Sequence, residues 1–200
     1  MPRRPRQFIE GETLHMIRRG NNRGTCFVDP FDRIAFLALL EELANSTSTA
    51  IHAYVLMGNH VHILTTPSAS TMPSALMHDL GLRYSRYFNR KHHRTGSLWE
   101  GRFWAAPVRT DTYILACHQY IELNPVRAGM VPCAAEYAWS SHRANIGQEM
   151  SRVLTRHPSV DGLAATVIKA TSAYACLFDK PLDDALVHSL RAGLSTGPDR

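Results

Sequence analysis

Long apolar runs and paired cysteines are both missing from this sequence. No stretch reaches the roughly 18 to 20 apolar residues of a membrane-spanning helix, and the N-terminal residues lack the apolar segment of a signal peptide. The four cysteines are scattered with no Cys-x-x-Cys pair, which argues against a disulfide framework and against a zinc ribbon. We therefore expect a cytoplasmic protein with no membrane association, whose cysteines are reduced and structural.

Lysine is also scarce, although the chain is basic. Lys and Arg number 22 against 17 Asp and Glu, and only Lys91, Lys169 and Lys180 are lysine. Arginine suits contacts with phosphate and nucleobases, but a GC-rich genome raises arginine content for no functional reason, so composition alone decides nothing. Position is more informative, because residues 83–109 form a block with a single acid, Glu100. Its cations are Arg83, Arg86, Arg90, Lys91, Arg94, Arg102 and Arg109.

With 200 residues and 44% hydrophobic content, the chain is long enough for one domain with an ordinary core. Hydrophobic periodicity and turn signals up to residue 124 predict seven elements. They are a strand at 13–19, a helix from Asp29-Pro30 to about 46, strands at 51–57 and 60–66, a helix at 71–91, a strand at 98–108 and a helix at 111–123.

The first six elements follow the βαββαβ order of a ferredoxin-like fold, an antiparallel sheet with helices on one face. Gly58-Asn59 predicts a tight hairpin between the two middle strands. Further helices are expected at 134–147 and between 160 and 195, with a loop from Phe178 to Leu182. We predict an α+β protein with a main domain at 1–145 and a helical extension at 146–200 whose tail is partly flexible.

Two predicted helices have distinct faces. The helix at 71–91 places Leu76, Leu80, Tyr84, Tyr87 and Phe88 on one side and Arg83, Arg86 and Arg90 on another. The helix that begins at Pro30 has an apolar stripe made of Phe31, Ile34, Ala35, Leu37, Ala38 and Leu39.

His60-Val61-His62 lies in the second strand of the predicted hairpin. Alternate residues of a strand share a face, so the two histidines project side by side, about 6 to 7 Å apart along the strand. This arrangement can chelate a divalent metal. In a chain with eleven histidines the triplet also arises by chance, and solvated or hydrogen-bonded histidines are the alternative interpretation.

Tyr120 and Asn124 are four residues apart on the helix that ends near Pro125, so they share a helix face. The amide oxygen of Asn124 is a hard metal ligand, and a tyrosine beside a metal is a candidate nucleophile toward a phosphodiester. Most helical tyrosines are core residues, however, and spacing alone leaves Tyr84, Tyr87 and Tyr113 as rivals.

Five blocks together resemble the REP-associated tyrosine transposases, a chromosomal branch of the insertion-sequence single-strand transposases within the HUH (His-hydrophobic-His) endonucleases. The resemblance covers roughly residues 10–145, with the blocks in order. Gly58 stands where many relatives have proline. The blocks are Arg18-Arg-Gly-Asn-Asn-Arg23, His52-Ala-Tyr-Val-Leu-Met-Gly-Asn-His-Val-His-Ile-Leu64, Tyr84-Ser-Arg-Tyr-Phe-Asn-Arg90, Arg94-Thr-Gly-Ser-Leu-Trp-Glu-Gly-Arg-Phe103 and Tyr120-Ile-Glu-Leu-Asn-Pro-Val-Arg-Ala-Gly129.

The resemblance implies a ferredoxin-like core in which His60, His62 and Asn124 hold Mg²⁺ or Mn²⁺. It implies that Tyr120 attacks single-stranded DNA, becomes joined to the 5′ phosphate and frees a 3′ hydroxyl. Substrates in the family are typically imperfect hairpins of repetitive palindromic DNA, flanked by short single strands. Related insertion-sequence enzymes are dimers, whereas the REP-associated branch leans toward monomers, so we expect a monomer rather than a homodimer.

The basic and aromatic residues then become candidate DNA contacts. The alternative is that the arginines form a solvated helix face and the aromatics fill the core. Arg3, Arg4 and Arg6 are expected to form a disordered arm, and Phe103 and Trp104 are further stacking candidates. The DNA-binding prediction comprises Arg18, Arg19, Arg23, Arg83, Arg86, Arg90, Lys91, Arg94, Trp99 and Arg102.

The sequence thus predicts a metal-dependent, tyrosine-using DNA endonuclease and strand-transferase. Two other hypotheses stay open. A non-catalytic binder of DNA hairpins would bind without cleaving under any metal, and binding would weaken steeply with salt. A phosphodiesterase that uses activated water would cleave without a covalent intermediate.

Overall fold

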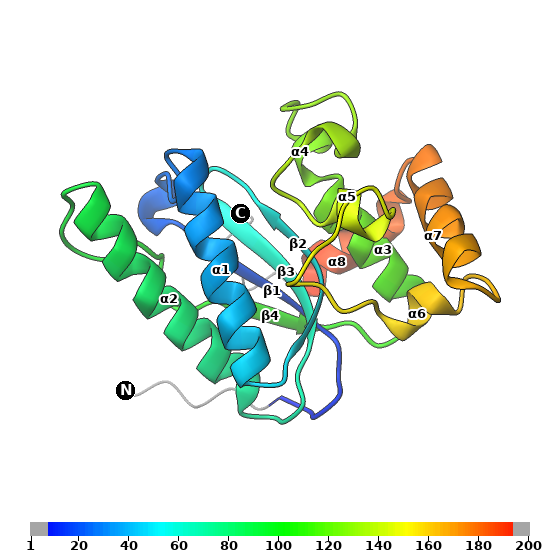
Figure 1. The fold of residues 1–200 in the computed structure, drawn as a ribbon, viewed down its shortest axis with the longest axis horizontal. Coiled ribbons are helices and arrows are strands. Elements are labelled where there is room, and N and C mark those ends of the chain that lie inside the picture. The colour runs from blue at the N-terminus through cyan, green and yellow to red at the C-terminus, as the bar shows by residue number, and fades with distance from the viewer. Residues whose placement is uncertain (1–7, 194–200) are drawn as a thin grey trace.

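A computed structural model describes residues 8–193 and contains a four-stranded antiparallel sheet (Figure 1). The strands are β1 (Leu14–Arg19), β2 (Ala50–Leu56), β3 (His60–Thr66) and β4 (Trp104–Pro107), in the order β2-β3-β1-β4. Helix α1 (Pro30–Ser46) connects β1 to β2, and α2 (Met72–Lys91) connects β3 to β4. This is the predicted βαββαβ arrangement, so the α+β, ferredoxin-like fold class is confirmed.

The two faces of the sheet carry different helices. Helices α1 and α2 cover one face, and the tyrosine-bearing helix α3 lies on the other with the later helices beside it (Figure 1). No helix between residues 8 and 193 is long and apolar enough to cross a membrane. The remaining helices are 3₁₀ turns at Asn21–Arg23, Ala134–Glu136 and Leu177–Asp179, and α3 (Asp111–Glu122), α4 (Asn124–Arg127), α5 (His142–Asn145), α6 (Pro158–Asp161), α7 (Val167–Cys176) and α8 (Asp184–Gly193).

Local signals explain where the main elements begin. Helix α1 starts at a capping box, in which Asp29 and Asp32 accept each other's backbone N–H groups, with Pro30 at the first helical position. The hydroxyl of Thr110 accepts from the backbone N–H of Tyr113 and caps α3. Gly20 closes the turn after β1, where a Cβ would overlap the carbonyl oxygen of Gly24.

The apolar stripe predicted for α1 is wrong. The helix turns Asp32, Phe36 and Leu40 toward the core, whereas the side chains of Phe31 and Ile34 are 68% and 53% exposed. Helix α1 is apolar on nearly every side, so composition does not define its buried face. Asp32, an acid of the first turn, is fully buried because its carboxylate caps the helix and pairs with Lys91.

Two predicted elements are shorter than expected. The strand expected at 98–108 is continuous only from Trp104 to Pro107. Before it, Trp99 makes a single bridge to Gly20 within a loop that buries Trp99 and Phe103. The helix expected at 134–147 is a 3₁₀ turn at Ala134–Glu136 followed by the single turn α5. Aromatic content indicated burial correctly in the first case, but a loop with one isolated bridge achieves that burial without a continuous strand.

Hydrogen bonds tie the segment after residue 145 to the sheet. The backbone N–H of Thr155 donates to the carbonyl of Ile51 at 2.7 Å, and His157 bonds to Thr13 at 3.0 Å. The boundary at residue 145 between a main domain and a helical extension stays a prediction. The predicted arm at Arg3, Arg4 and Arg6 and the tail from Ser195 lie outside the described residues.

The four cysteines are free thiols. Cys26 and Cys117 are buried, whereas Cys133 and Cys176 are exposed, so a packing role fits only the first two.

Candidate functional site

Strand alternation places two histidines of neighbouring strands on the α3 face. Val61 and Ile63 of β3 belong to the core under α1 and α2, which leaves His60, His62 and Leu64 on the opposite face. Because β1 pairs with β3, His15 reaches the same face, and its Nε2 lies 2.9 Å from Nδ1 of His62. The ring centroids of the predicted pair, His60 and His62, are 5.0 Å apart.

With Asn124 as a donor, the hydrogen-bond partners of this pair favour one tautomer of each ring. Asn124 presents its amide nitrogen to Nε2 of His62 at 3.3 Å, and an amide nitrogen can only donate. The proton of neutral His62 therefore lies on Nδ1, which donates to His15. Nδ1 of His60 lies 2.6 Å from the acceptor Oδ1 of Asn59, so its proton also lies on Nδ1. Both rings thus carry an Nε2 lone pair, which metal coordination requires.

Burial keeps the inner histidines neutral. His15 and His62 are each 1% exposed. Desolvation lowers the pKa of His15 to about 3, and burial together with the neighbouring His15 and His60 holds the pKa of His62 well below its ordinary value. Neutral imidazoles are the form that binds metals.

Tyr120 lies directly against these histidines. Its ring centroid is 5.8 Å from that of His15 and 5.9 Å from that of His62, and the side chain is only 2% exposed. The guanidinium carbon of Arg127, on α4, lies 4.4 Å from the centroid of the Tyr120 ring. The structure thus brings the predicted Tyr120, Asn124, His60 and His62 together and adds His15 and Arg127.

The donor set suits a divalent metal. Two neutral imidazoles and the amide oxygen of Asn124 are ligand types found with Mn²⁺, and the oxygen is of the kind that Mg²⁺ prefers. Asn124 lies within hydrogen-bond distance of His62, so rotation of its amide would turn that oxygen toward the same space. The residues present therefore fit the expected metal.

A second cluster of possible metal ligands is explained by helix capping and ion pairing. The side chains of Asp29, Asp32 and His92 meet where α1 begins and α2 ends. Nζ of Lys91 already lies 2.7 Å and 2.8 Å from their two carboxylates, and His92 lies 3.0 Å from Asp32. Burial raises the pKa of Asp32, but hydrogen bonds from Lys91 and His92 outweigh it and hold the pKa at about 2. This is a cap and ion-pair cluster.

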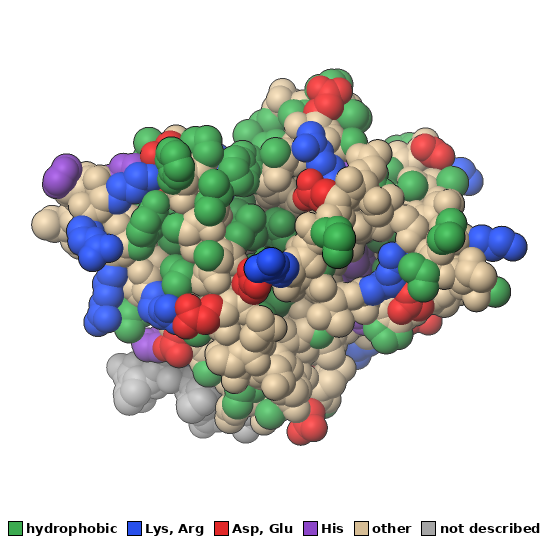
Figure 2. Space-filling view, viewed as in Figure 1, with side chains coloured by type: hydrophobic (Ala, Val, Ile, Leu, Met, Phe, Trp, Pro, Cys, Tyr) green, Lys and Arg blue, Asp and Glu red, His purple; other side chains and the backbone are tan. Residues whose placement is uncertain are grey.

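The basic block of α2 is separated from Tyr120 by the sheet. Lys and Arg side chains gather over α2 in Figure 2, on the opposite face of the sheet from α3. Arg86 and Arg90 are exposed, Arg83 pairs with Glu42 at 2.8 Å, and Lys91 belongs to the cap cluster. The exposed cations of this block therefore lie on the face of the sheet away from Tyr120.

The other predicted DNA contacts are dispersed. Arg19 stands opposite His60 in the β1–β3 pair, so it lies at the edge of the histidine site. Arg23, Arg94 and Arg102 are exposed in loops. Trp99 is 4% exposed in the core, and its indole N–H donates to the carbonyl of Gly81 at 3.1 Å. This placement favours the alternative that Trp99 fills the core.

A buried carboxylate lies between Tyr120 and Asn124 on the sequence. Glu122 is fully buried and accepts hydrogen bonds from Ser141, His142, Asn145 and Tyr174 at 2.5 to 2.9 Å. The network joins α3 to α5 and α7, so it fixes the orientation of the tyrosine helix. A charged residue flanked by Ile121 and Leu123 was the only sequence signal for it.

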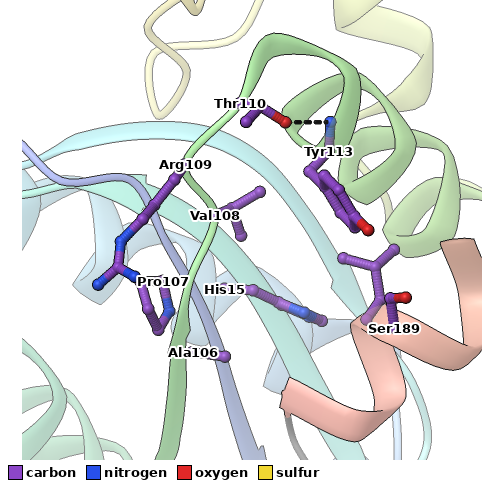
Figure 3. A pocket seen from close by; sticks show the side chains of 9 residues that line it. His15, Ala106, Pro107, Val108, Arg109, Thr110, Tyr113 and Ser189 are labelled. Atoms are coloured by element: carbon purple, nitrogen blue, oxygen red, sulfur yellow. Dashed lines mark hydrogen bonds between the residues drawn. The ribbon is translucent and has the colours of Figure 1, made fainter.

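His15 also borders a cavity of about 260 Å³ next to α8 (Figure 3). Figure 3 shows its ring pointing from β1 toward Ser189, with the Thr110 cap of α3 above it. Nδ1 of His15 is buried and has no hydrogen-bond partner among residues 8–193. His15 was not predicted from the sequence. The only signal for it was its position in a strand, two residues from another residue whose side chain faces inward.

Comparison with known proteins agrees with this geometry. Residues 9–124 match the family model described as "Transposase IS200 like". Because the match spans more than half of the sequence, the chain belongs to the IS200-like transposase family. The matched region contains the histidine pair, Tyr120 and Asn124.

Two relatives indicate which branch of the family the chain resembles. A protein of Haemophilus influenzae, whose curated name assigns it to the REP-associated tyrosine transposases, is 31% identical over 62 residues. That match covers 31% of this chain and 35% of the relative, so it spans about a third of the relative's length. The solved structure of a REP-associated tyrosine transposase bound to a REP hairpin matches with a TM-score of 0.61 and 18% identity, over 78% of this chain and 92% of that one. The resemblance drawn from the five sequence blocks is confirmed, and the structural match supports the fold.

Proposed function

We propose that this chain is a metal-dependent single-strand DNA endonuclease and strand-transferase that acts on hairpin-containing repeats through Tyr120. The observation that carries the proposal is the contact of Tyr120 with His15 and His62, at ring distances below 6 Å from both. Membership of the transposase family supports it, as does the REP hairpin bound to the structural relative.

His60, His62 and Asn124 would hold Mg²⁺ or Mn²⁺. When bound, the ion would polarise the scissile phosphate and offset its negative charge. His15 is proposed to orient His62, because its Nε2 accepts the Nδ1 proton and leaves Nε2 of His62 for coordination.

Tyr120 is the proposed nucleophile. Its hydroxyl oxygen forms a bond to phosphorus, and the bond from phosphorus to the 3′ oxygen of the preceding nucleotide breaks. The phenol loses a proton and the released 3′ oxygen takes one up, which leaves a 5′-phosphotyrosine and a 3′ hydroxyl. Attack by that hydroxyl on the phosphotyrosine reverses the step and rejoins the strand.

Arg127 is proposed to stabilise this chemistry electrostatically. Its guanidinium lies over the Tyr120 ring, where negative charge is present on both the nucleophile and the phosphate during the transfer. Tyr120 is almost fully buried, so a DNA phosphate reaches it only after the ring becomes more accessible.

The test is a covalent adduct. The protein is incubated with Mn²⁺ and single-stranded oligonucleotides that form hairpins with short flanks, and a denaturing gel is examined for a protein–DNA band. Wild type is expected to form the band, and Tyr120→Phe is expected to lose it while Tyr113→Phe keeps it. Cleavage without any adduct would favour activated water, and hairpin binding without cleavage would favour a non-catalytic binder.

A further inference from the structure

Arg18 lies on the face of the sheet opposite Tyr120, in a slot between α2 and Trp99. Its guanidinium carbon is 5.1 Å from the centroid of the Trp99 ring, and Nη1 donates to the carbonyl of Met77. The slot depends on Gly81, because a Cβ at that position would overlap the guanidinium. A glycine inside a long helix is unfavourable relative to alanine. Gly81 therefore lowers the intrinsic stability of α2 but leaves room for the Arg18 side chain.

Among residues 8–193, no acid balances the charge of Arg18. In the described part of the chain no carboxylate lies within ion-pair distance of it, and its Nε is buried without a hydrogen-bond partner. Burial lowers the pKa of Arg18 to about 10, so the group is still a cation at neutral pH. Arg83 and Lys91, on the same face, are both paired with carboxylates. A cation that is partly withdrawn from water without a counter-charge is unfavourable unless an anion completes it.

Arg18 borders a groove that is open to solvent. The groove measures about 680 Å³ and lies between the first half of α2 and the loop before β4. Its rim carries the exposed side chains of Ser74, His78 and Arg102, which are donors suited to an anion. Asp79, also on the rim, interacts electrostatically with Arg83.

We propose that this groove binds a phosphate of the nucleic-acid backbone, with Arg18 at its floor and Arg102 at its rim. The inference rests on the proposed function for the identity of its ligand. Because the sheet separates Arg18 from Tyr120, the groove holds a part of the DNA away from the bond that is cut. The exposed Arg86 and Arg90 lie further along α2.

The experiment measures DNA affinity as a function of salt. Wild type, Arg18→Gln and Lys169→Gln, a matched loss of charge on α7, are titrated onto two fluorescent probes, a single strand of about 20 nucleotides and a hairpin of similar length. Arg18→Gln is expected to weaken binding about tenfold and to reduce the slope of log affinity against log salt by about one. Lys169→Gln is expected to match wild type. The probe that responds tells whether the phosphate belongs to the single strand or to the duplex stem.

Two further measurements keep the test decisive. If Arg18→Gln unfolds, Arg102→Gln at the exposed rim is expected to give the same reduction in slope. Wild-type affinity and slope in both variants would overturn the proposal. If Arg18→Gln binds DNA like wild type and still forms the Tyr120 adduct, the proposed groove is wrong and the proposed catalysis stands. If wild type binds DNA through Arg18 but forms no adduct, the proposed catalysis is wrong and the groove stands.

Discussion

The two faces of the sheet are built from different kinds of residue. Under α1 and α2, the rings of Phe27, Phe36, Tyr84 and Trp99 pack with centroids 5.1 to 6.4 Å apart, among aliphatic side chains. Under α3, the buried groups include His15 and His62 in the site and Glu122 in its network. Apolar burial stabilises the first face, whereas the second holds polar groups that are unfavourable unless their hydrogen bonds are satisfied.

This difference shows how one sheet combines a stabilising apolar core with the proposed reactive site. Strand alternation sends neighbouring residues of β1 and β3 to opposite faces, so the apolar core and the histidines share the same strands. Changes on the α1/α2 face should therefore act on folding. Changes on the α3 face should act on metal binding and DNA transfer as well.

Truncating the apolar face should give the largest loss of stability. Phe36→Ala removes a fully buried ring and should lower the free energy of unfolding by about 3 to 5 kcal/mol, measured by urea denaturation. Mn²⁺ affinity of the folded fraction should stay at the wild-type value. A fall in that affinity would mean that the two faces are not independent.

Glu122→Gln should destabilise the protein less. The variant replaces a buried carboxylate that accepts four hydrogen bonds, and each bond to a charged group contributes about 1.5 to 3 kcal/mol, with partial retention by the amide. We expect a loss near the lower end of that range, together with slower adduct formation by the folded protein. Tyr174→Phe, which removes one of the four donors, should cost about 1.5 kcal/mol, the lower end of the same range. Stability equal to wild type in Glu122→Gln would contradict the network's role.

Removing the partner of His62 should affect the metal more than the fold. His15→Ala should weaken Mn²⁺ binding by about 10- to 100-fold, measured by electron paramagnetic resonance on the protein without DNA. His188→Ala, an exposed histidine on α8, is the matched control. Wild-type Mn²⁺ affinity in His15→Ala would show that His15 does not orient the ligand.

Acid should reduce stability through histidines at the far end of the α3 face. Burial lowers the pKa of His52 to about 4, and its ring faces His157 at 4.6 Å, with His118 close enough to interact electrostatically. An unfolded chain binds a proton at His52 below about pH 6.5 that the folded chain rejects, so stability falls as the pH drops from 6.5 to 4. The slope is up to about 1.4 kcal/mol per pH unit for each such histidine.

His52→Gln should flatten this dependence relative to wild type. The measurement is urea denaturation at a series of pH values, with His188→Gln as the control. Parallel curves for wild type and His52→Gln would contradict the assignment.

Local patterns predicted most of the fold. Caps, the Gly58-Asn59 turn and the periodicity of α2 each depend on neighbours in sequence, so β1, α1, the hairpin, α2 and α3 were all anticipated. The loop before β4 and the buried face of α1 were not, because tertiary packing decides which apolar residues are covered.

Only part of the candidate site was predicted, because the rest also depends on tertiary packing. His60 with His62 is visible as a short spacing within one strand. Tyr120 with Asn124 is visible as a short spacing across the junction of α3 and α4. His15 meets His62 only through β1–β3 pairing, and Glu122 meets Tyr174 across 52 residues. Contacts of this kind depend on topology, which a single local pattern does not contain.

The central claim is that Tyr120 is the nucleophile of a reaction carried out on the α3 face. The most direct measurement is mass spectrometry of the covalent adduct, after digestion of protein and DNA, to locate the tyrosine that carries a nucleotide. The account predicts a 5′-phosphate ester on Tyr120 in every modified molecule. Modification of Tyr84, Tyr87 or Tyr113 with Tyr120 unmodified would contradict it.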